Sequence, residues 1–445
     1  MDSAQTPETP ATAPEFKTVT IDPDGDLYLK VTTDDDSQVW TFRVCSAALR
    51  RRSPVWKKML FGPWKERKPT SSDKDWIVEL FDDCLQAMQL VLHIIHGNFD
   101  MVPPLFLSLR QLHDLLVVAH KYDMVNIIKP WSQNWASIAQ GSKSEAEDIV
   151  MSFYVAWQLG DANLFARRLQ EIAVHSSLDA ERRLVLKKQS AGLFASKSTQ
   201  VILENVDHIG PEDILETITQ IRADLIEAII RPVHDDLGAR LKVSPACSFK
   251  CQPFDLDAGS SRLCDAAILG GIHSGMLKWT NCLLPDKQAL ILDSVVGLAS
   301  WLFQCMTNVE TIPRHRDTCS ITQKYINLSS KVHASIPTVS ASHITASHRS
   351  YMEKNRVKTG LAKQGPDTAI SIYWVLQQPL FSKTVYDRIS TPAASSIFGA
   401  SIPIRAAAPT AATTASSGNT SASSIFRTAP TATTTTATPS GGLFH

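Results

Sequence analysis

The sequence lacks the features that would assign it to several large classes of protein. Its eight cysteines are spread irregularly over 445 residues, which excludes a disulfide framework. Basic and acidic residues number 44 each, so no global charge draws the chain to nucleic acid or anionic membranes. Residues 1–15 are polar and contain no apolar core of a signal peptide. These absences predict a soluble protein of the cytoplasm, the nucleus or both.

No apolar run is long enough to predict a membrane span. The most apolar helix candidate, residues 289–306, contains Asp293 and Gln304. It is marginal for the roughly 20 apolar residues that a span requires. A helix of this kind is more typical of a protein core, so we expect no membrane partner.

Motifs of catalysis are also missing. The chain has no phosphate-binding P-loop and no Gly-x-Gly-x-x-Gly motif that leads into a helix. Residues 271–275 read Gly-Ile-His-Ser-Gly, which places Ser274 one position away from the centre of a Gly-x-Ser-x-Gly nucleophile elbow. We therefore expect a protein that is not an enzyme, with no catalytic residues and no cofactor.

The best candidate for a metal site combines three cysteines with one histidine. Cys247, Cys251, Cys264 and His273 are residue types that bind zinc, but they do not form two short-spaced pairs. Free cysteine is commonly a small buried apolar side chain. The spacing favours core packing and leaves metal binding by the three cysteines as an open alternative.

The first 140 residues carry the clearest strand signals. Residues 27–31 alternate apolar and polar side chains, which predicts a strand with one buried face. Residues 34–37 form a polar turn, and residues 39–44 predict a second strand that completes a hairpin. Residues 76–80 predict a third strand.

Helix boundaries are marked by capping residues in the same region. Ser53 is an expected N-cap with Pro54 at the first helical position, where the missing N–H costs nothing. Asp83 is expected to cap the next helix, which ends at Gly97. Residues 108–111, Ser-Leu-Arg-Gln, match a capping box that opens another apolar-striped helix.

The order of these elements and the residues themselves resemble the BTB/POZ family. The family pattern has a strand opening with Asp, then F-x-V-H-x-x-x-L-x-x-x-S-P-V-F-x-x-M-L, and later a helix ending in A-x-K-Y-D. Cys45 stands where the family usually has His, and Trp56 stands where it usually has Phe. The resemblance covers roughly residues 19–139. The matching residues are Asp26, Phe42, Val44, Leu49, Ser53, Pro54, Val55, Met59, Leu60, Ala119, Lys121, Tyr122 and Asp123.

The resemblance implies an α+β fold over residues 19–140, a short sheet with surrounding helices that recognises other proteins. Family members often self-associate, and some are substrate adaptors for cullin-type ubiquitin ligases. A homodimer and a cullin are therefore candidate partners. The family's strand-exchanged dimers use an extra N-terminal helix and strand, whereas a short Pro- and Thr-rich stretch precedes Asp26 here, so a monomer stays an open alternative.

A basic cluster is the main electrostatic feature of the chain. Such a run is usually a solvated face, which we favour over binding to nucleic acid or an acidic partner. The family's Asp at the position of Asp26 lies near a dimer groove, so Asp26 is a candidate contact. The cluster comprises Arg50, Arg51, Arg52, Lys57, Lys58, Lys65, Arg67 and Lys68. The candidate protein-binding residues are Asp26, Arg50, Lys57 and Lys58 for charge, and Phe61 and Trp64 for anchoring.

Residues 145–310 are predicted to be mainly helical. Helices over 149–160 and 164–174 are separated by Gly160 and Asp161, and Pro211 opens a long helix with an apolar stripe. Packing within one helical domain is favoured over an exposed coiled-coil seam. Pro232 predicts a bend or a stop. Part of this region, at 264–272 and 284–285, resembles the helical region that follows the BTB domain in many fungal members.

The two ends of the chain are predicted to be disordered. Residues 1–18 are polar, and residues 391–445 are mostly Ala, Ser, Thr, Pro and Gly, a composition that cannot offset backbone entropy by burial. Residues 311–390 predict only partial helix. Ala-Ser-Ser-Ile-Phe occurs at both 394–398 and 422–426, for which low-complexity drift is favoured over a Phe-Gly tail. A scaffold linked by this tail to the nuclear pore or to transcription is the alternative function.

Overall fold

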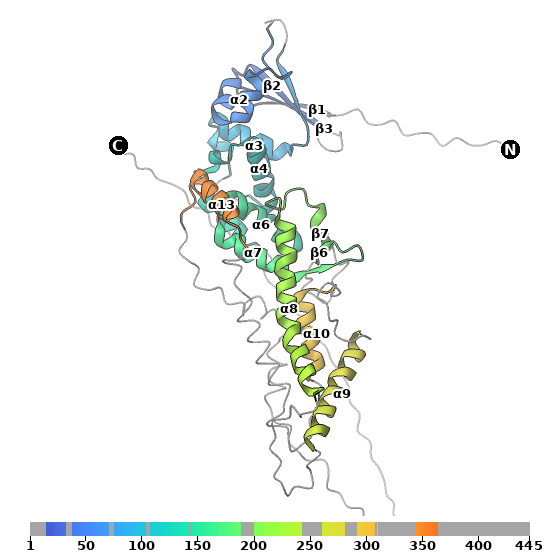
Figure 1. Ribbon diagram of the computed structural model, residues 1–445. Helices are drawn as coiled ribbons and strands as arrows, with labels where there is room; N and C mark the ends of the chain where they lie inside the picture. The colour runs from blue at the N-terminus through green and yellow to red at the C-terminus, as the bar shows by residue number, and fades with distance from the viewer. Residues whose placement is uncertain are drawn as a thin grey trace, which may run out of the picture. The chain divides into compact units, whose positions relative to one another are not determined.

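The computed structural model describes residues 15–32, 38–70, 75–103, 107–142, 145–187, 200–242, 260–280, 292–307, 309 and 343–363. These residues form a mixed α+β structure that is mainly helical, with a small sheet near the N-terminus (Figure 1). All of them belong to one compact unit, Met1–Asp387. The predicted C-terminal disorder over 391–445 and the partners Cys247 and Cys251 of the candidate metal site lie outside the described residues.

The N-terminal sheet has four strands in the order β1-β3-β2-β4. The predicted hairpin is confirmed: β2 (Leu27–Thr32) and β3 (Gln38–Val44) are antiparallel, with Leu29 opposite Phe42. The third predicted strand is β4 (Ile77–Leu80), which runs parallel to β2.

A further strand, β1 (Glu15–Thr20), runs parallel to β3 at the edge of this sheet. Disorder was expected up to residue 18, but the chain is paired from Glu15 onward. The physical reason is that every residue of β1 has a partner in register on β3. This pairing gives hydrogen-bond partners to backbone groups of β1, which composition alone cannot predict.

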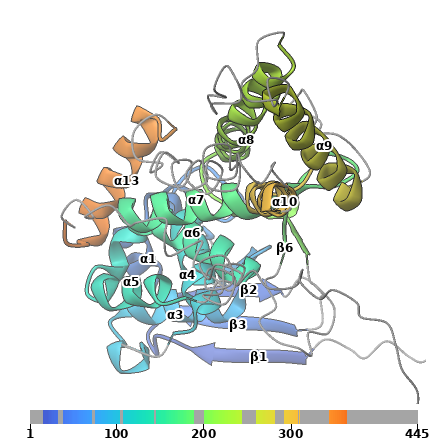
Figure 2. The ribbon, with the colours of Figure 1, turned by 90° about the horizontal axis from the view of Figure 1, so that it is seen from below.

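Five helices accompany the sheet, and α3 packs directly against it (Figure 2). The predicted caps are present: Ser53 accepts a hydrogen bond from the amide of Trp56, Gly97 adopts a left-handed conformation with φ 81°, and Ser108 and Gln111 form a capping box. The helices are α1 (Ser46–Arg52), α2 (Pro54–Phe61), α3 (Leu85–His96), α4 (Leu109–Lys121) and α5 (Ser132–Gln140), with short 3-10 turns at Phe99–Met101 and Val125–Ile128.

The capping role expected for Asp83 is not present. The N-cap of α3 is Cys84, and Asp83 points into the core instead. Its carboxylate accepts a hydrogen bond from the hydroxyl of Tyr122 at 2.7 Å and forms an ion pair with Lys121 at 3.1 Å. A buried carboxylate is stabilised by such partners, and these outweigh the local capping preference.

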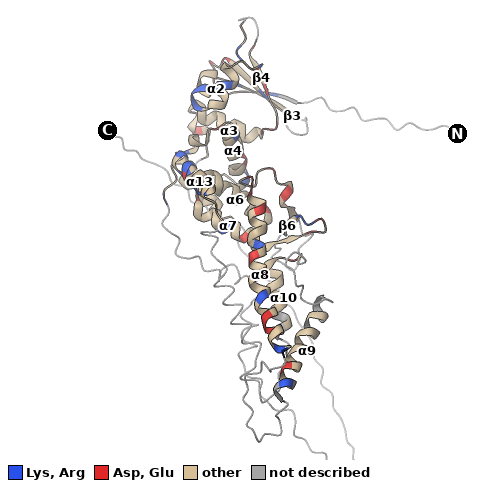
Figure 3. Cartoon of the chain, in the orientation of Figure 1, with Lys and Arg blue, Asp and Glu red and all other residues tan. Residues whose placement is uncertain are grey.

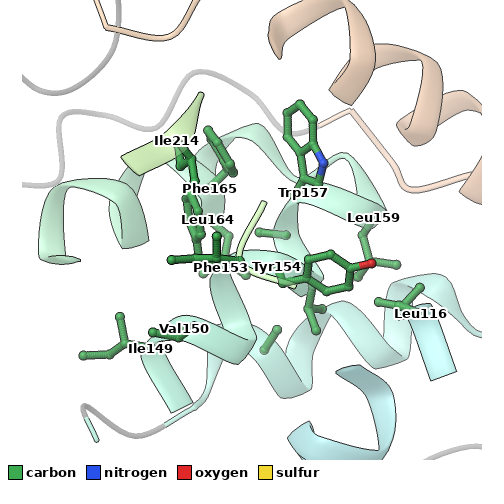
Figure 4. Close-up of a cluster of buried hydrophobic side chains, with 14 of the residues drawn as sticks. Leu116, Ile149, Val150, Phe153, Tyr154, Trp157, Leu159, Leu164, Phe165 and Ile214 are labelled. Atoms are coloured by element: carbon green, nitrogen blue, oxygen red, sulfur yellow. The ribbon is translucent and has the colours of Figure 1, made fainter. Parts of the chain in front are cut away.

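The middle of the chain contains three of the predicted helices, α6 (Ala146–Leu159), α7 (Ala162–His175) and α8 (Ile214–Arg240). Gly160 ends α6 in a left-handed conformation, and Asp161 caps α7 through the amide of Leu164. Figure 4 shows Leu116 of α4 in the same buried cluster as residues of α6 and α7. Helices on both sides of the expected boundary at residues 140–145 therefore share one core.

The apolar stripe of α8 is buried within this unit, as predicted. Pro232, expected to bend or stop the helix, lies inside it, and α8 continues to Arg240. The hydrogen bond that proline removes is the one to the carbonyl of Ala228, and Ala228 is exposed, so water can satisfy that oxygen.

A second sheet, absent from the sequence-based prediction, interrupts the helical region. Strands β5 (Ser176–Leu178), β6 (Leu184–Lys187) and β7 (Gln200–Ile202) are antiparallel in that order and are followed by a 3-10 turn at Leu203–Asn205. All three strands have four residues or fewer, too short for an alternating pattern to stand out.

Three more helices complete the described chain: α9 (Ser260–Thr280), α10 (Val295–Thr307) and α13 (Ala346–Thr359). Helix α10 covers most of the apolar segment predicted to be core, and Val295, Leu298 and Leu302 are buried. No helix among the described residues has the length and apolar character needed to cross a membrane.

Helix α13 docks on α6 although nearly 190 residues separate them in sequence. Tyr351 stacks on Trp157 with ring centroids 4.2 Å apart. His348 lies 2.6 Å from the carboxylate of Asp213, and Thr359 donates a hydrogen bond to the carbonyl of Leu159 at 2.9 Å. The partly helical character expected for residues 311–390 is therefore present at 346–359.

The buried His93 and the half-buried His175 predict acid sensitivity. Burial lowers the pKa of His93 below its ordinary value of 6.5; nearby His96 adds to this, and Asp100 opposes it. Burial likewise lowers the pKa of His175. The unfolded chain therefore binds these protons more readily, and the free energy of unfolding is expected to fall as the pH drops below 6.5. Urea unfolding at pH 7 and at pH 5 measures this loss of stability. The His93→Leu variant should show a smaller difference in the free energy of unfolding between the two pH values. An unchanged pH dependence in that variant would contradict the role given to His93.

Candidate protein-binding surface

The basic cluster is built on two short helices whose other faces are fixed in the core. Arg50, Arg51 and Arg52 form the last turn of α1, where positive charge is favoured by the helix dipole. In α2, Trp56 and Leu60 are fully buried. Because these side chains face inward, Lys57, Lys58 and Phe61 are left exposed.

We call the exposed outer side of this region the basic–aromatic surface. Figure 3 shows Lys and Arg gathered at α2. Phe61 and Trp64 are 40% and 60% exposed, and aromatic side chains presented in this way are suited to anchoring a partner. The surface comprises Arg50, Arg51, Arg52, Lys57, Lys58, Phe61, Trp64, Lys65, Arg67 and Lys68.

Aromatic rings organise the cations of this surface. The guanidinium of Arg50 lies 4.7 Å from the centroid of Phe61, within range of a cation–π interaction. Phe61 in turn meets Trp76 edge-on at 6.0 Å, and the ammonium of Lys68 lies 5.6 Å from the Trp76 ring. The structure thus brings two predicted residues, Arg50 and Phe61, into direct contact, and Trp76 packs against Phe61.

Trp64 is held on a loop that is tied to the sheet. The amide of Arg67 donates to the carbonyl of Trp64 at 3.2 Å, and the amide of Lys68 donates to that of Leu60 at 3.2 Å. The indole of Trp76 donates to the carbonyl of Glu66 at 2.9 Å. These bonds fix the backbone around Trp64, so its exposed indole is presented from an ordered turn.

Asp26 belongs to the same neighbourhood but is engaged within the fold. Its carboxylate accepts hydrogen bonds from the amide and hydroxyl of Ser46, both at 2.9 Å, at the start of α1. Lys68 forms an ion pair with it at 3.2 Å. Partial burial opposes ionisation, but the bonds from Ser46 and the ammonium of Lys68 outweigh it and hold the pKa of Asp26 below its ordinary value. Asp26 therefore supports α1 and orients Lys68.

The backbone at Cys45 has a polar partner that the sequence did not reveal. Its amide donates to Nε2 of His96 at 3.0 Å, and Nδ1 of His96 lies 2.8 Å from the carbonyl of Leu92. In this arrangement Nε2 of His96 accepts a hydrogen bond and Nδ1–H donates one. A histidine on α3 thus ties α3 to the end of β3, independently of the Cys45 side chain.

The structure describes two of the four candidate metal ligands, Cys264 and His273. Cys264 is buried in α9, whereas His273 is exposed on the same helix. Within the described ranges, no three His, Cys, Asp or Glu side chains come together in an arrangement that could hold a metal ion.

Sequence reasoning missed Trp76 as a member of the site. The residue was assigned only to the start of a strand, and its contact with Phe61 joins segments on either side of an intervening loop. The sequence also gave no sign of other exposed apolar side chains. They include Ile77 in β4, Phe81 just after it, and Phe99 and Met101 in the 3-10 turn after α3.

No protein-family model, curated protein or solved structure was found to match this chain. Its function is therefore inferred from its own residues.

Proposed function

We propose that residues 19–140 are a BTB/POZ-type recognition module and that the chain is a non-enzymatic interaction protein. One observation carries the proposal: two motif segments 69 residues apart meet in the core. The hydroxyl of Ser53 donates to the carbonyl of Tyr122 at 2.5 Å, and Trp56 stacks on Tyr122 at 4.5 Å with an 11° interplanar angle. A motif whose distant parts contact each other is more specific evidence of a shared fold than either part alone.

We further propose that the module acts as a substrate adaptor for a cullin-type ubiquitin ligase, with self-association as a second expected property. A partner would bury Phe61 and Trp64, while the surrounding cations would orient it and raise its association rate. This assigns the five exposed predicted residues, the cations Arg50, Lys57 and Lys58 with the aromatic pair, to one contact surface. The alternative of a scaffold that acts through the tail depends on residues 391–445, outside the described chain.

Complex formation by the purified full chain tests the adaptor proposal. Mixed with a cullin N-terminal domain at about 50 μM, well above the Kd of a functional complex, the chain is expected to elute as a stoichiometric complex in size exclusion with light scattering. Lys57→Glu with Lys58→Glu should abolish the complex, because charge reversal at an interface repels the partner. The matched control, Lys242→Glu with Arg262→Glu, reverses two exposed cations away from this surface, one just past the end of α8 and one in α9. A chain that elutes alone as a monomer contradicts both the adaptor role and self-association.

A further inference from the structure

We infer that the basic–aromatic surface binds an acidic segment of a partner protein. This inference rests on the proposed recognition function and specifies the chemistry of what is recognised. It gives a role to the cations of residues 50–68 beyond that of an ordinary solvated face.

The charge imbalance of this surface is the first observation. Residues 50–68 contain eight cationic side chains and one carboxylate, Glu66, in a chain whose total charge is zero. Two of the cations have partners: Lys65 lies 3.8 Å from Glu66, and Lys68 pairs with Asp26. Six form no ion pair with any carboxylate of the described residues, and these are Arg50, Arg51, Arg52, Lys57, Lys58 and Arg67.

Such crowding of like charge is unfavourable unless counter-charge is supplied. Three consecutive arginines close α1, and Lys57 and Lys58 follow in α2. Repulsion between neighbouring cations is relieved when carboxylates lie between them, and arginine binds a carboxylate through two parallel hydrogen bonds. A segment rich in Asp or Glu therefore complements the surface.

The exposed aromatics favour a polypeptide with apolar residues among its acids. Phe61 is fixed between Arg50 and Trp76, so this ring need not be ordered when a partner binds, and the backbone that carries Trp64 is tied in a turn. Binding to pre-positioned aromatic rings costs little conformational entropy. An apolar side chain packed against Phe61 or Trp64 would also shield the surrounding ion pairs from water.

The size and border of the surface disfavour nucleic acid. Helices α1 and α2 have seven and eight residues, which gives each a length of about 10–12 Å. The exposed carboxylate of Asp75, next to Trp76, would repel a phosphate backbone extending past the patch. A short peptide segment fits within these limits, and a duplex does not.

Peptide binding to the full chain tests the inference. The probe is a fluorescein-labelled 12-residue peptide of Glu and Asp with one Leu and one Trp, and the control is the same peptide with every acid replaced by Lys. Fluorescence anisotropy in 50 mM NaCl is expected to show micromolar binding of the acidic peptide, weakened at least about tenfold in 500 mM NaCl because the pairs are screened. The lysine peptide should not bind.

Matched variants locate the site. Arg51→Glu with Lys58→Glu should weaken the acidic peptide by about tenfold or more, and Trp64→Ala by about fivefold, since each removes surface contacts without touching the core. Lys242→Glu with Arg262→Glu has the same change in charge and should leave binding unchanged. Far-UV circular dichroism verifies that each variant is folded.

Two results would overturn the inference: no binding of the acidic peptide at 50 mM NaCl, or tighter binding of a single-stranded 12-nucleotide DNA than of the peptide. Equal binding by the two charge-reversal pairs would also contradict it, because the site would then lie elsewhere. A chain that binds a cullin but not the peptide refutes only this inference. A chain that binds the peptide but neither a cullin nor itself refutes only the adaptor proposal.

Discussion

Replacing Trp56 by alanine is expected to lower the free energy of unfolding by about 3–5 kcal/mol, the usual cost of truncating a fully buried aromatic residue. Trp56 is 0% exposed and stacks on Tyr122, so its removal leaves a cavity between α2 and the end of α4. The same ring lies beside the hydrogen bond from Ser53 to Tyr122, the contact that joins the two motif segments. Urea unfolding followed by far-UV circular dichroism measures the loss.

The matched control is Trp64→Ala, which removes the same side chain from a site eight residues further along. Because Trp64 is 60% exposed, its loss should change stability by no more than about 0.5 kcal/mol. Trp56→Phe should cost under about 1.5 kcal/mol, since it keeps a stacked ring and removes a buried indole N–H that has no partner among the described residues. Similar losses for the two alanine variants would contradict the burial of Trp56.

Much of the N-terminal fold was predictable because its signals are local. The alternation of residues 27–31, the Ser53 cap followed by Pro54, the Ser108 capping box and the left-handed Gly97 each act within a few residues. Local preferences of this kind survive whenever the tertiary structure agrees with them. The apolar stripe of α8 was equally predictable because it repeats over many helical turns.

The features that were missed depend on partners far away in the sequence. Asp83 has a good position to cap α3, but Tyr122 and Lys121 supply stronger partners in the core. Strand β1 is defined by its pairing with β3, not by its own composition. Helix α13 is polar along most of its length, and its position depends on Trp157 and Asp213. No local pattern encodes such contacts.

The candidate surface was predictable in its charges but not in its architecture. The cations of residues 50–68 can be read directly from the sequence, as can the nearby Phe61 and Trp64. Which of them face outward follows from the helical phase set by Trp56 and Leu60. The role of Trp76 beneath Phe61, and the engagement of Asp26 by Ser46, required the tertiary structure.

Replacing Gly160 by alanine is expected to release α13 while the rest of the chain stays folded. Gly160 has φ 78°, and a Cβ there would overlap the carbonyl oxygen of Met352 and the backbone of Arg356, which belong to α13. Backbone atoms held in a helix cannot move aside as a flexible side chain can. The variant should therefore lose the Trp157–Tyr351 stack and the hydrogen bond from Thr359, for a total of about 3 kcal/mol or more including backbone strain.

Gly97→Ala separates the two causes of this loss. Gly97 also ends a helix in the left-handed region, with φ 81°, but no described atom lies within 4 Å of the position its Cβ would take. That variant should carry only the conformational cost of about 1–2 kcal/mol and leave α13 docked. Hydrogen exchange measured by mass spectrometry distinguishes the two variants. The backbone amides of residues 346–359 should exchange rapidly in Gly160→Ala, and slowly in Gly97→Ala and in the parent chain. Equal protection of α13 in both variants would mean that the close approach at Gly160 does not hold this helix in place.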